Sequence, residues 1–439
     1  PQITPIRADS FSTPIGGNLR NRRIYPEVAN LGLESTPHTM RLLILTPQLP
    51  YPPRQGTALR NWGLLSGLAR RHEVWLLSFA EPGEVPHPTL AAACARIPTF
   101  PPSGRSTSGR LGRIATSTLP DMAWRLWSPE FLAQARTWLR EAAFDALQVE
   151  GIELARYGLA LGPALRAGGG RVVFDDHNCE YLLQQRSAET DLRNPRRWHA
   201  AAYSLVQTLR LRAFERRAAR DADATLVVSR QDGASLRRLD PALRPYEIPN
   251  GIDTAHYDRF KADEDGAALV FTGKMDFRPN IDAMLWFGAE VWPRIKAARP
   301  DSRWWIVGQK PSPRLEGLRG DSAITITGAV DDIRAEIGRA AVYIAPLRVG
   351  GGTRFKLLEA MAMRRAIVTT RLGCEGFEVE SGREMVVADM PEVFARSVLE
   401  LLADPNRRAA LGERGHAFVQ ASYDWSAIVP RLEDLLRKR

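Results

Sequence analysis

The sequence predicts an α/β protein in which two Rossmann-like domains follow one another along the chain. Short apolar segments alternate with helical stretches, and this alternation is typical of parallel strands that helices cover on both faces. The alternation pauses at 248–253, where the sequence IPNGID is rich in turn-forming residues, and then starts again. A chain of 439 residues is also long enough for two or three domains.

The first set of elements begins after residues 1–39, which lack sustained periodicity and are expected to form a flexible tail. Strands are expected in this set at Leu42–Leu45, Val74–Phe79, Ala146–Val149, Val172–Phe174 and Thr225–Val228. Helices are expected at Leu59–Arg70, Pro129–Ala143 and Trp198–Ala219. Residues 83–119 are rich in Pro and Gly and support no prediction.

The second set of elements repeats the same alternation without any internal sequence repeat. Its strands are expected at Leu269–Thr272, Trp304–Val307, Ile324–Thr327, Val342–Ala345, Ile367–Thr369 and Met385–Val387. Its helices are expected at Ile281–Ala298, Ile333–Ala340, Arg354–Met363 and Pro391–Leu402.

The composition is that of an ordinary globular protein, with 44% hydrophobic and 25% charged residues. No apolar run is long enough for a transmembrane helix, and the polar first residues do not resemble a secretory signal. The three cysteines lie far apart, which disfavours a metal motif or a disulfide framework and suits a reducing cytoplasm. The net charge of +10 is spread along the chain without a nucleic-acid-binding motif, so an anionic substrate or membrane surface explains it as well.

The most informative segment is PLRVGGGTRFKLLEAMAM, residues 346–363. It leads from a strand into three glycines and a helix, a geometry that brings free backbone amides to an anion such as phosphate. Arg354 and Lys356 lie in the first turn, where an anion would offset the repulsion between their charges and the helix dipole. Glu359 follows one turn later, where it can accept hydrogen bonds from a sugar hydroxyl. The segment therefore predicts a nucleotide site, and a crossover helix with a Lys356–Glu359 surface pair is the alternative.

This segment, with AIVTT at 366–370 and GCEG at 373–376, resembles the donor-binding segment of retaining family 4 glycosyltransferases of the GT-B fold. The family pattern is a Glu, seven residues, and a second Glu followed by Ala-Met-Ala. Glu359 and the AMA after it match the second half, whereas Gly351 stands at the position of the first Glu. The backbone amides of Gly351, Gly352 and Thr353 are the expected substitutes for that carboxylate.

The resemblance implies two Rossmann-like domains that face each other across a cleft. It implies an acceptor domain at 40–248, a nucleotide-sugar donor domain at 249–424, and a final helix at 425–439 that crosses back onto the first domain. The sequence IPNGID also resembles the interdomain segment of the family.

Two loops of the first domain supply candidate site residues. Gly56 lies between the first strand and the first helix, and the resemblance implies that this loop faces the donor phosphates and the acceptor; an ordinary turn is the alternative. His177, in FDDHNCE after the strand at 172–174, is implied to bind the donor sugar or to support the transition state. A metal at Asp175, Asp176 and His177, or a capping Asp with a structural His, are the alternatives.

The loop FTGKMDFRPN at 271–280 resembles the diphosphate clamp of the family. Gly273 matches the glycine of the clamp, Lys274 stands where the family has Arg, and the Lys that follows in the family is Asn280 here. Arg354 and Lys356 are expected to supply the missing charge, and Arg278 is a further candidate, with a solvated loop charge as its alternative.

The helix expected at 198–219 carries an apolar stripe at helical spacing and several arginines. The stripe consists of Trp198, Ala202, Leu205 and Leu209, and the arginines are Arg210, Arg212, Arg216, Arg217 and Arg220. This helix could face an anionic lipid carrier, but a stripe in contact with the core and solvated arginines are the favoured interpretation.

The resemblance predicts a retaining hexosyltransferase that moves a sugar from a nucleotide-diphosphate donor to an acceptor hydroxyl without a metal. Fixed positive groups stabilise the departing diphosphate, so Lys274, Arg354, Lys356 and His177 are expected to act in catalysis and Glu359 to bind the ribose. The expected acceptor is a glycan or a lipid-linked molecule in polysaccharide or glycoconjugate biosynthesis. The expected location is the cytoplasm, with or without peripheral contact with the inner face of an anionic membrane.

Three other functions are kept as alternatives. A nucleotide-sugar epimerase or a phosphorylase-like enzyme would use the same fold. A non-catalytic nucleotide- or glycan-binding scaffold would follow if the Gly351 and Asn280 departures abolished activity. A nucleic-acid binder is the least favoured, since no motif supports it.

Overall fold

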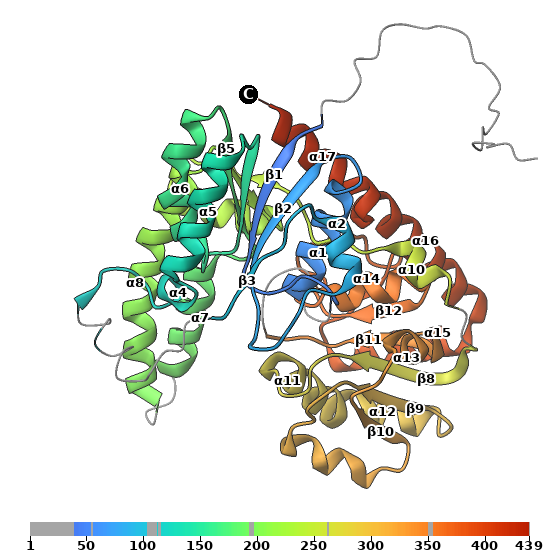
Figure 1. The fold of residues 1–439 in the computed structure, drawn as a ribbon. Coiled ribbons are helices and arrows are strands. Elements are labelled where there is room, and N and C mark those ends of the chain that lie inside the picture. Colours follow the sequence, from blue (N-terminus) through green and yellow to red (C-terminus); the bar gives the residue numbers. More distant parts are fainter. Residues whose placement is uncertain are drawn as a thin grey trace, which may run out of the picture. The chain divides into compact units, whose positions relative to one another are not determined.

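The computed structural model describes residues 39–53, 56–102, 112, 116–192, 197–260, 263–349 and 354–438. Within these ranges the chain forms two parallel sheets that follow one another in sequence (Figure 1). The expected flexible tail, 1–39, lies outside the described residues apart from Thr39.

The first sheet has seven parallel strands in the order β3-β2-β1-β4-β5-β6-β7. The strands are β1 (Arg41–Thr46), β2 (Glu73–Phe79), β3 (Thr99–Phe100), β4 (Ala146–Glu150), β5 (Arg171–Asp176), β6 (Ala224–Val227) and β7 (Tyr246–Glu247). The order reverses between β1 and β4, which pair directly, with Leu43 opposite Leu147. In an open parallel sheet, such a reversal leaves a crevice at the carboxyl ends of the strands, where ligands bind.

The second sheet has six parallel strands in the order β10-β9-β8-β11-β12-β13, with its reversal between β8 and β11. The strands are β8 (Asp265–Thr272), β9 (Arg303–Val307), β10 (Ile324–Gly328), β11 (Ala340–Ala345), β12 (Ala366–Thr369) and β13 (Val386–Val387). The two sheets confirm the predicted fold class.

The helices of the first half are α1 (Gly56–Leu68), α2 (Pro88–Ala93), α4 (Met122–Arg125), α5 (Pro129–Glu141), α6 (Ala155–Ala167), α7 (Glu180–Leu192), α8 (Trp198–Asp221) and α9 (Arg230–Leu239). Those of the second half are α10 (Thr254–Asp258), α11 (Arg278–Trp286), α12 (Trp292–Ala298), α13 (Ile333–Arg339), α14 (Phe355–Ala362), α15 (Pro391–Ala403), α16 (Pro405–Tyr423) and α17 (Trp425–Arg437). The helix expected at 281–298 begins earlier, at Arg278, and is interrupted by a π-helical turn at Phe287–Val291. A 3₁₀ helix spans Pro313–Gly320.

Both faces of each sheet are buried, as parallel strands require. In β8, Leu269 and Phe271 pack into one hydrophobic layer with Trp304, while Val270 packs into the opposite layer with Tyr343. Successive side chains of a strand point to opposite faces, so a strand that is apolar throughout supplies both layers.

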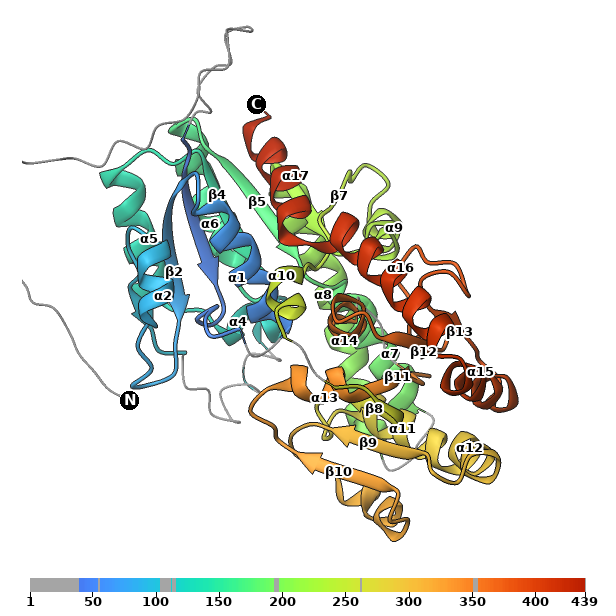
Figure 2. The ribbon, with the colours of Figure 1, turned by 90° about the vertical axis from the view of Figure 1, so that its right-hand side faces the viewer.

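The last helix, α17, packs against α1 of the first domain, as the fold prediction required. A Cβ placed on Gly63 of α1 would lie 1.9 Å from the Trp425 ring, so only glycine lets the two helices approach this closely. Asp424 anchors the start of α17 by accepting a hydrogen bond from the Thr254 hydroxyl at 2.6 Å. Figure 2 shows α16 and α17 running in succession from the second sheet to the first.

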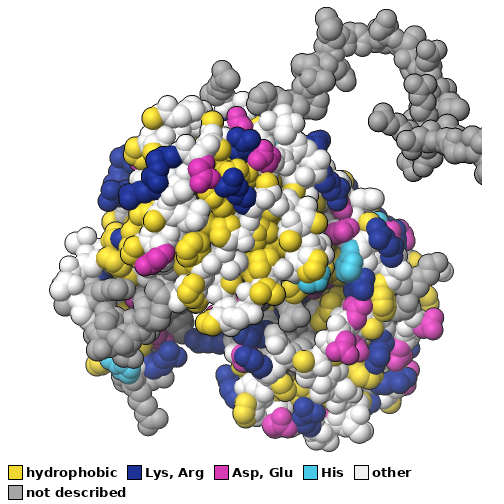
Figure 3. Space-filling view, in the orientation of Figure 1, with side chains coloured by type: hydrophobic (Ala, Val, Ile, Leu, Met, Phe, Trp, Pro, Cys, Tyr) yellow, Lys and Arg dark blue, Asp and Glu magenta, His cyan; other side chains and the backbone are white. Residues whose placement is uncertain are grey.

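On the face shown in Figure 3, Lys and Arg side chains are scattered and have Asp and Glu among them. Among the helices of the described ranges, none is both long and apolar enough to cross a membrane.

Candidate functional site

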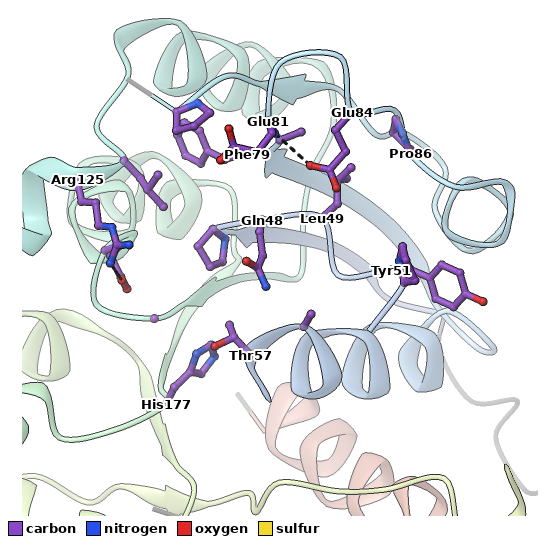
Figure 4. A pocket seen from close by; sticks show the side chains of 18 of the residues that line it. Gln48, Leu49, Tyr51, Thr57, Phe79, Glu81, Glu84, Pro86, Arg125 and His177 are labelled. Atoms are coloured by element: carbon purple, nitrogen blue, oxygen red, sulfur yellow. Dashed lines mark hydrogen bonds and ion pairs between the residues drawn. The ribbon is translucent and has the colours of Figure 1, made fainter. Parts of the chain in front are cut away.

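A pocket with a volume of about 1200 Å³ lies at the carboxyl ends of β1, β2, β4 and β5, at the reversal point of the first sheet. Polar side chains line it: Gln48, Glu81 and His177 follow three of these strands, and Arg125 comes from the end of α4 (Figure 4). Glycines occupy the tight turns, and Gly151 adopts a φ of 84° directly after β4. The fold therefore brings loops from distant parts of the sequence to one site.

His177 lies in this pocket and is held by a carboxylate from the neighbouring strand. Its Nε2 lies 2.6 Å from Oε2 of Glu150, the last residue of β4, and 4.0 Å from Oδ2 of Asp175. Burial lowers the pKa of His177, but the hydrogen bond to Glu150 and the charge of Asp175 outweigh it and raise the pKa overall. Burial and the charge of Asp175 also raise the pKa of Glu150, so both shifts favour keeping a proton on the His177–Glu150 pair.

Asp175 forms a buried ion pair with Arg60. Nε and Nη2 of Arg60 each donate to one of its carboxylate oxygens at 2.9 Å, and the side chains of both residues are at most 1% exposed. Nη1 of Arg60 also donates to the carbonyl oxygens of Ile248 and Pro249, at 2.9 and 3.1 Å. Arg60 therefore ties the end of β5 to the segment that precedes the second domain.

The side chains of Asp175, Asp176 and His177, which were the alternative metal site, do not come together in one group. Asp175 and His177 gather with Glu150, whereas Asp176 faces the opposite way and gathers with Cys179 and Glu215. In the first group, both oxygens of Asp175 accept hydrogen bonds from Arg60, and Glu150 is hydrogen-bonded to His177.

Asp176 and Glu215 form a buried pair of carboxyl groups. Glu215, in α8, accepts hydrogen bonds from the backbone amides of Glu180 and Tyr181 at 2.8 and 3.1 Å, in the first turn of α7. Burial and the nearby charge of Glu215 raise the pKa of Asp176 well above its ordinary value, and burial raises the pKa of Glu215 to about 8. Oxygens of the two carboxyl groups lie within 4.8 Å of each other, so ionising both is unfavourable and folding favours a proton on the pair.

We expect Asp176→Asn to flatten the pH dependence of stability. A carboxyl whose pKa is raised by folding contributes stability below its unfolded pKa, and this is lost as pH rises through the folded pKa, here between about 4.5 and about 8. An asparagine amide can donate to Glu215 without a titrating proton, so the loss should shrink by about 1 kcal/mol or more, since one pKa unit corresponds to about 1.4 kcal/mol. The free energy of unfolding from urea denaturation at acidic and mildly alkaline pH measures this, with the exposed Asp389→Asn as control. Equal slopes for Asp176→Asn and the wild type would contradict the shared proton.

The second candidate region lies at the end of β8 and the start of α14. Gly273 follows β8, and a Cβ on it would lie 2.8 Å from Nζ of Lys356 and 2.7 Å from Nδ2 of Asn280. Any other residue at this position would displace one of the two side chains. The glycine predicted from the clamp motif therefore lets Lys356 and Asn280 lie close to the backbone.

The side chain of Lys356 reaches Asn280, which stands where the resembled family has a lysine. Its Nζ donates to Oδ1 of Asn280 at 2.9 Å and lies 4.0 Å from the centre of the Phe271 ring. Nδ2 of Asn280 donates to the carbonyl oxygen of Lys274 at 2.9 Å, which fixes the direction of the amide. Burial, with a smaller contribution from the charge of Arg354, lowers the pKa of Lys356 to about 7. Burial therefore removes water from the ammonium group and brings its pKa close to 7 before any anion binds.

Glu359 lies one turn after Lys356 and has a partner of its own. The Tyr257 hydroxyl donates to Oε1 of Glu359 at 3.0 Å, and burial raises the pKa of Glu359 to about 7. Lys356 and Glu359 therefore contact different residues, Asn280 and Tyr257, which disagrees with the alternative of a solvent-exposed Lys356–Glu359 pair.

The remaining predicted residues are less closely engaged. The side chain of Lys274 is 52% exposed, and its Nζ lies 3.6 Å from Asp276 rather than beside Asn280. Arg278 is exposed at the start of α11. Arg354 precedes α14 as its N-cap residue, and burial lowers its pKa. A Cβ on Gly56 would lie 3.3 Å from the Phe355 ring, which places the start of α1 beside the start of α14.

Gly351, Gly352 and Thr353 lie outside the described residues, so their expected contacts stay predictions. Sequence reasoning missed three residues of the site: Glu150, Tyr257 and Arg60. Glu150 had a usable signal, because it ends a strand next to the strand that carries His177. Tyr257 and Arg60 had none, because neither belongs to a motif or a periodic pattern.

Two family models match the chain. The model described as Glycosyltransferase Family 4 matches residues 55–256, and the model described as Glycosyl transferases group 1 matches residues 266–404. Together they account for most of the chain, one in each half.

Among curated relatives, a GDP-mannose-dependent alpha-(1-6)-phosphatidylinositol monomannoside mannosyltransferase from Mycolicibacterium smegmatis is 27% identical over 309 residues, which is 64% of this chain and 73% of that protein. The chain spans about half the length of other curated relatives that it matches, 48% in one case and 55% in another.

Solved structures of similar fold include sucrose-phosphate synthase from Thermosynechococcus elongatus, with a TM-score of 0.65 and 18% identity over 90% of this chain and 98% of that one. Anabaena HepE in complex with UDP and glucose has a TM-score of 0.60 and 13% identity, over 91% of this chain and 100% of that one. At these identities the likeness establishes the fold, and it agrees with the predicted GT-B architecture.

Proposed function

Because the chain belongs to the group 1, family 4 glycosyltransferases, we propose that it transfers a hexose from a nucleotide-diphosphate sugar to an acceptor hydroxyl. The observation that carries this proposal is the arrangement on α14, where the Lys356 ammonium and the Glu359 carboxylate lie one turn apart beside Gly273. A cation and a carboxylate at this separation suit a diphosphate and a sugar hydroxyl of the same ligand.

The donor would place its diphosphate against Lys356. Lys356 is partly buried beside a neutral partner, Asn280, so an incoming diphosphate would supply the negative charge that its ammonium lacks. Glu359, held by Tyr257, would accept a hydrogen bond from the ribose. The mycolicibacterial relative is named as GDP-mannose-dependent, whereas Anabaena HepE was solved with UDP and glucose. These names support a nucleotide-diphosphate hexose as the donor class.

We further propose transfer with retention and without a metal. Fixed positive charge at the diphosphate can stabilise its departure, which is the task that a divalent cation performs elsewhere. The departing phosphate would help to remove the proton from the acceptor hydroxyl on the same face of the sugar. His177, oriented by Glu150 at 2.6 Å, would support the positive charge that develops on the sugar or bind its hydroxyl groups.

The acceptor would bind in the pocket of the first domain. Its lining offers carboxylates and amides, such as Glu81, Glu84 and Gln48, that suit the hydroxyl groups of a glycan. The named substrate of the mycolicibacterial relative is a lipid-linked sugar. We therefore propose a glycan or lipid-linked acceptor in polysaccharide or glycoconjugate biosynthesis. The free cysteines Cys94, Cys179 and Cys374 support a cytoplasmic site of action.

A panel of UDP-, GDP-, ADP- and dTDP-linked sugars tests this function by thermal stability, with and without EDTA. We expect one nucleotide class to stabilise the protein selectively, by about 2.7 kcal/mol at a hundredfold excess over the dissociation constant, and the shift to survive EDTA. Nucleoside monophosphates, which lack the diphosphate, serve as the matched control. Stabilisation that EDTA abolishes would overturn metal independence.

Other outcomes of the panel separate the alternatives. A product in which an altered sugar remains on the nucleotide would identify an epimerase. Selective binding without transfer to any acceptor would favour a non-catalytic scaffold. Gly351, which stands where the family has its first Glu, supports this alternative. No stabilisation by any nucleotide sugar would overturn the proposed donor site.

A further inference from the structure

The long helix α8 presents two chemically distinct faces. Its buried residues include Ala201, Ser204, Leu211, Phe214 and Ala218, which face the rest of the first domain. The opposite face is exposed along the whole helix, and α7 lies beside α8 without covering it (Figure 1). The sequence-based expectation that the stripe at 198, 202, 205 and 209 contacts the core is therefore wrong. The core contact is made by the residues on the other side of the helix.

The first half of the exposed face is apolar. Trp198 is 60% exposed and Leu209 is 71% exposed, and Leu205 and Val206 lie between them on the same face. Leu192, at the end of α7, is also exposed and adjoins Trp198, whose ring nitrogen donates to its carbonyl oxygen at 3.2 Å. We call these five residues the apolar tip. Half of the ten exposed large hydrophobic residues in the described ranges belong to it.

The second half of the same face is basic. Arg212, Arg216, Arg217 and Arg220 follow the apolar tip at helical spacing, and all are exposed. Arg216 and Arg220 contact Asp240 but keep 47% and 53% of their side chains exposed. The two acidic residues of α8 do not weaken this charge on the exposed face, because Glu215 is buried and Asp221, at the end, pairs with Arg166.

We propose that the exposed face of α8 docks on an anionic membrane surface. A helix with Trp and Leu on one part of its outer face and arginines on the rest can bury the apolar side chains at the acyl boundary while the arginines bind anionic headgroups. Each basic residue near such a surface contributes about 1 kcal/mol. The net charge of the chain, +10, adds a longer-range attraction of the same sign.

The charge pattern disfavours self-association through this face. A two-fold contact brings the same patch of two copies together. If the helices paired in parallel, arginines would oppose arginines; if they paired antiparallel, arginines would cover the apolar tip. A membrane satisfies both halves of the face at once.

Helix α7 connects the pocket to the apolar tip of the docking face. Glu180, at the start of α7, lines the pocket, and Leu192, at the end of α7, belongs to the apolar tip. A helix of 13 residues is about 20 Å long, so the tip lies about 20 Å from the pocket along α7. If the proposed function holds, a lipid-linked acceptor in the membrane would be presented within this distance of the pocket.

Vesicle flotation of the full chain tests the docking face. We expect binding to vesicles of phosphatidylcholine mixed with phosphatidylglycerol, weak binding to phosphatidylcholine alone, and release by salt. Trp198→Ser/Leu209→Ser should weaken binding at least about tenfold. Arg212→Gln/Arg217→Gln should weaken it about thirtyfold, from the loss of two basic contacts. These side chains are exposed, so circular dichroism and the melting temperature should stay unchanged.

Matched controls distinguish the face from general charge and hydrophobicity. Arg314→Gln/Arg396→Gln removes two exposed arginines elsewhere, and Met390→Ser removes an exposed apolar side chain, and both variants should bind as the wild type does. Equal binding of the α8 variants and the wild type would overturn the proposal. A second outcome would also overturn it: the wild type fails to bind vesicles but forms a dimer, and the Trp198→Ser/Leu209→Ser variant does not form that dimer. Stabilisation by nucleotide sugars should be the same in all α8 variants, so failure of the donor panel and failure of docking are separate results.

Discussion

Replacing Lys356 with alanine is expected to lower kcat by about 10²–10³-fold and to change the KM for the donor only a few-fold. The Lys356 ammonium is partly buried and donates to Asn280 at 2.9 Å, and an alanine would leave no positive charge at that point. If it stabilises the charge of the departing diphosphate, its removal raises the barrier more than it weakens ground-state binding. Steady-state kinetics with the donor class identified by the thermal panel provide the measurement.

Two variants make the result specific. Glu359→Ala should instead mainly raise the donor KM, by about ten- to a hundredfold, because the loss of a hydrogen bond to a charged group costs about 1.5–3 kcal/mol. Lys310→Ala, an exposed lysine after β9, should leave both constants unchanged. Unchanged turnover in Lys356→Ala would remove Lys356 from the transition state.

The pH dependence of donor affinity provides a second test of the role of Lys356. In the free protein the pKa of Lys356 is about 7, and a bound diphosphate would raise it because it supplies a negative charge. Binding would then take up a proton above pH 7, so affinity should fall as pH rises, by no more in total than the few-fold change expected for Lys356→Ala. Lys356→Arg should bind with a flatter profile, because a guanidinium stays protonated throughout this range.

Replacing Arg60 with methionine is expected to destabilise the protein by about 3–5 kcal/mol. The substitution would leave the Asp175 carboxylate buried at 0% exposure without the two hydrogen bonds that neutralise it. It would also leave the carbonyl oxygens of Ile248 and Pro249 without their donor. The free energy of unfolding from chemical denaturation measures the loss.

An exposed ion pair provides the matched control for Arg60. Arg41 pairs with Glu73, and their side chains are 38% and 36% exposed, so Arg41→Met should cost no more than about 1 kcal/mol. The double variant Arg60→Met/Asp175→Asn should recover part of the loss, because it no longer buries an unpaired charge. Similar losses in Arg60→Met and Arg41→Met would show that burial does not increase the contribution of the ion pair to stability.

Local patterns predicted most of the regular structure. The strands β1, β2, β4, β5 and β8 were visible because each contains a short run of apolar residues, as expected of a strand that is buried on both faces. The strands β3 (Thr99–Phe100) and β7 (Tyr246–Glu247) were not predicted, because each has only two residues and lacks the apolar run that revealed the equally short β13 (Val386–Val387). They pair only because the edges of an existing sheet, β2 and β6, hold them in place.

The stripe on α8 shows the limit of this reasoning. Spacing alone identified Trp198, Ala202, Leu205 and Leu209 as one face of a helix, and that is correct. It could not say which face meets the core, because the small and polar residues on the other side pack well enough to be buried. Exposure of a face depends on what the rest of the chain places against it.

The sequence by itself determined the order of strands and helices, the class of fold and the position of a predicted anion site at the start of α14, because each depends on residues that are neighbours in the chain. Only the tertiary structure decided which charges meet. Lys356 reaches Asn280 across 76 positions of sequence, and Arg60 reaches Asp175 across 115. Such contacts follow from strand order and burial, which set the distance between side chains and the solvation of their charges, and no local pattern records either quantity.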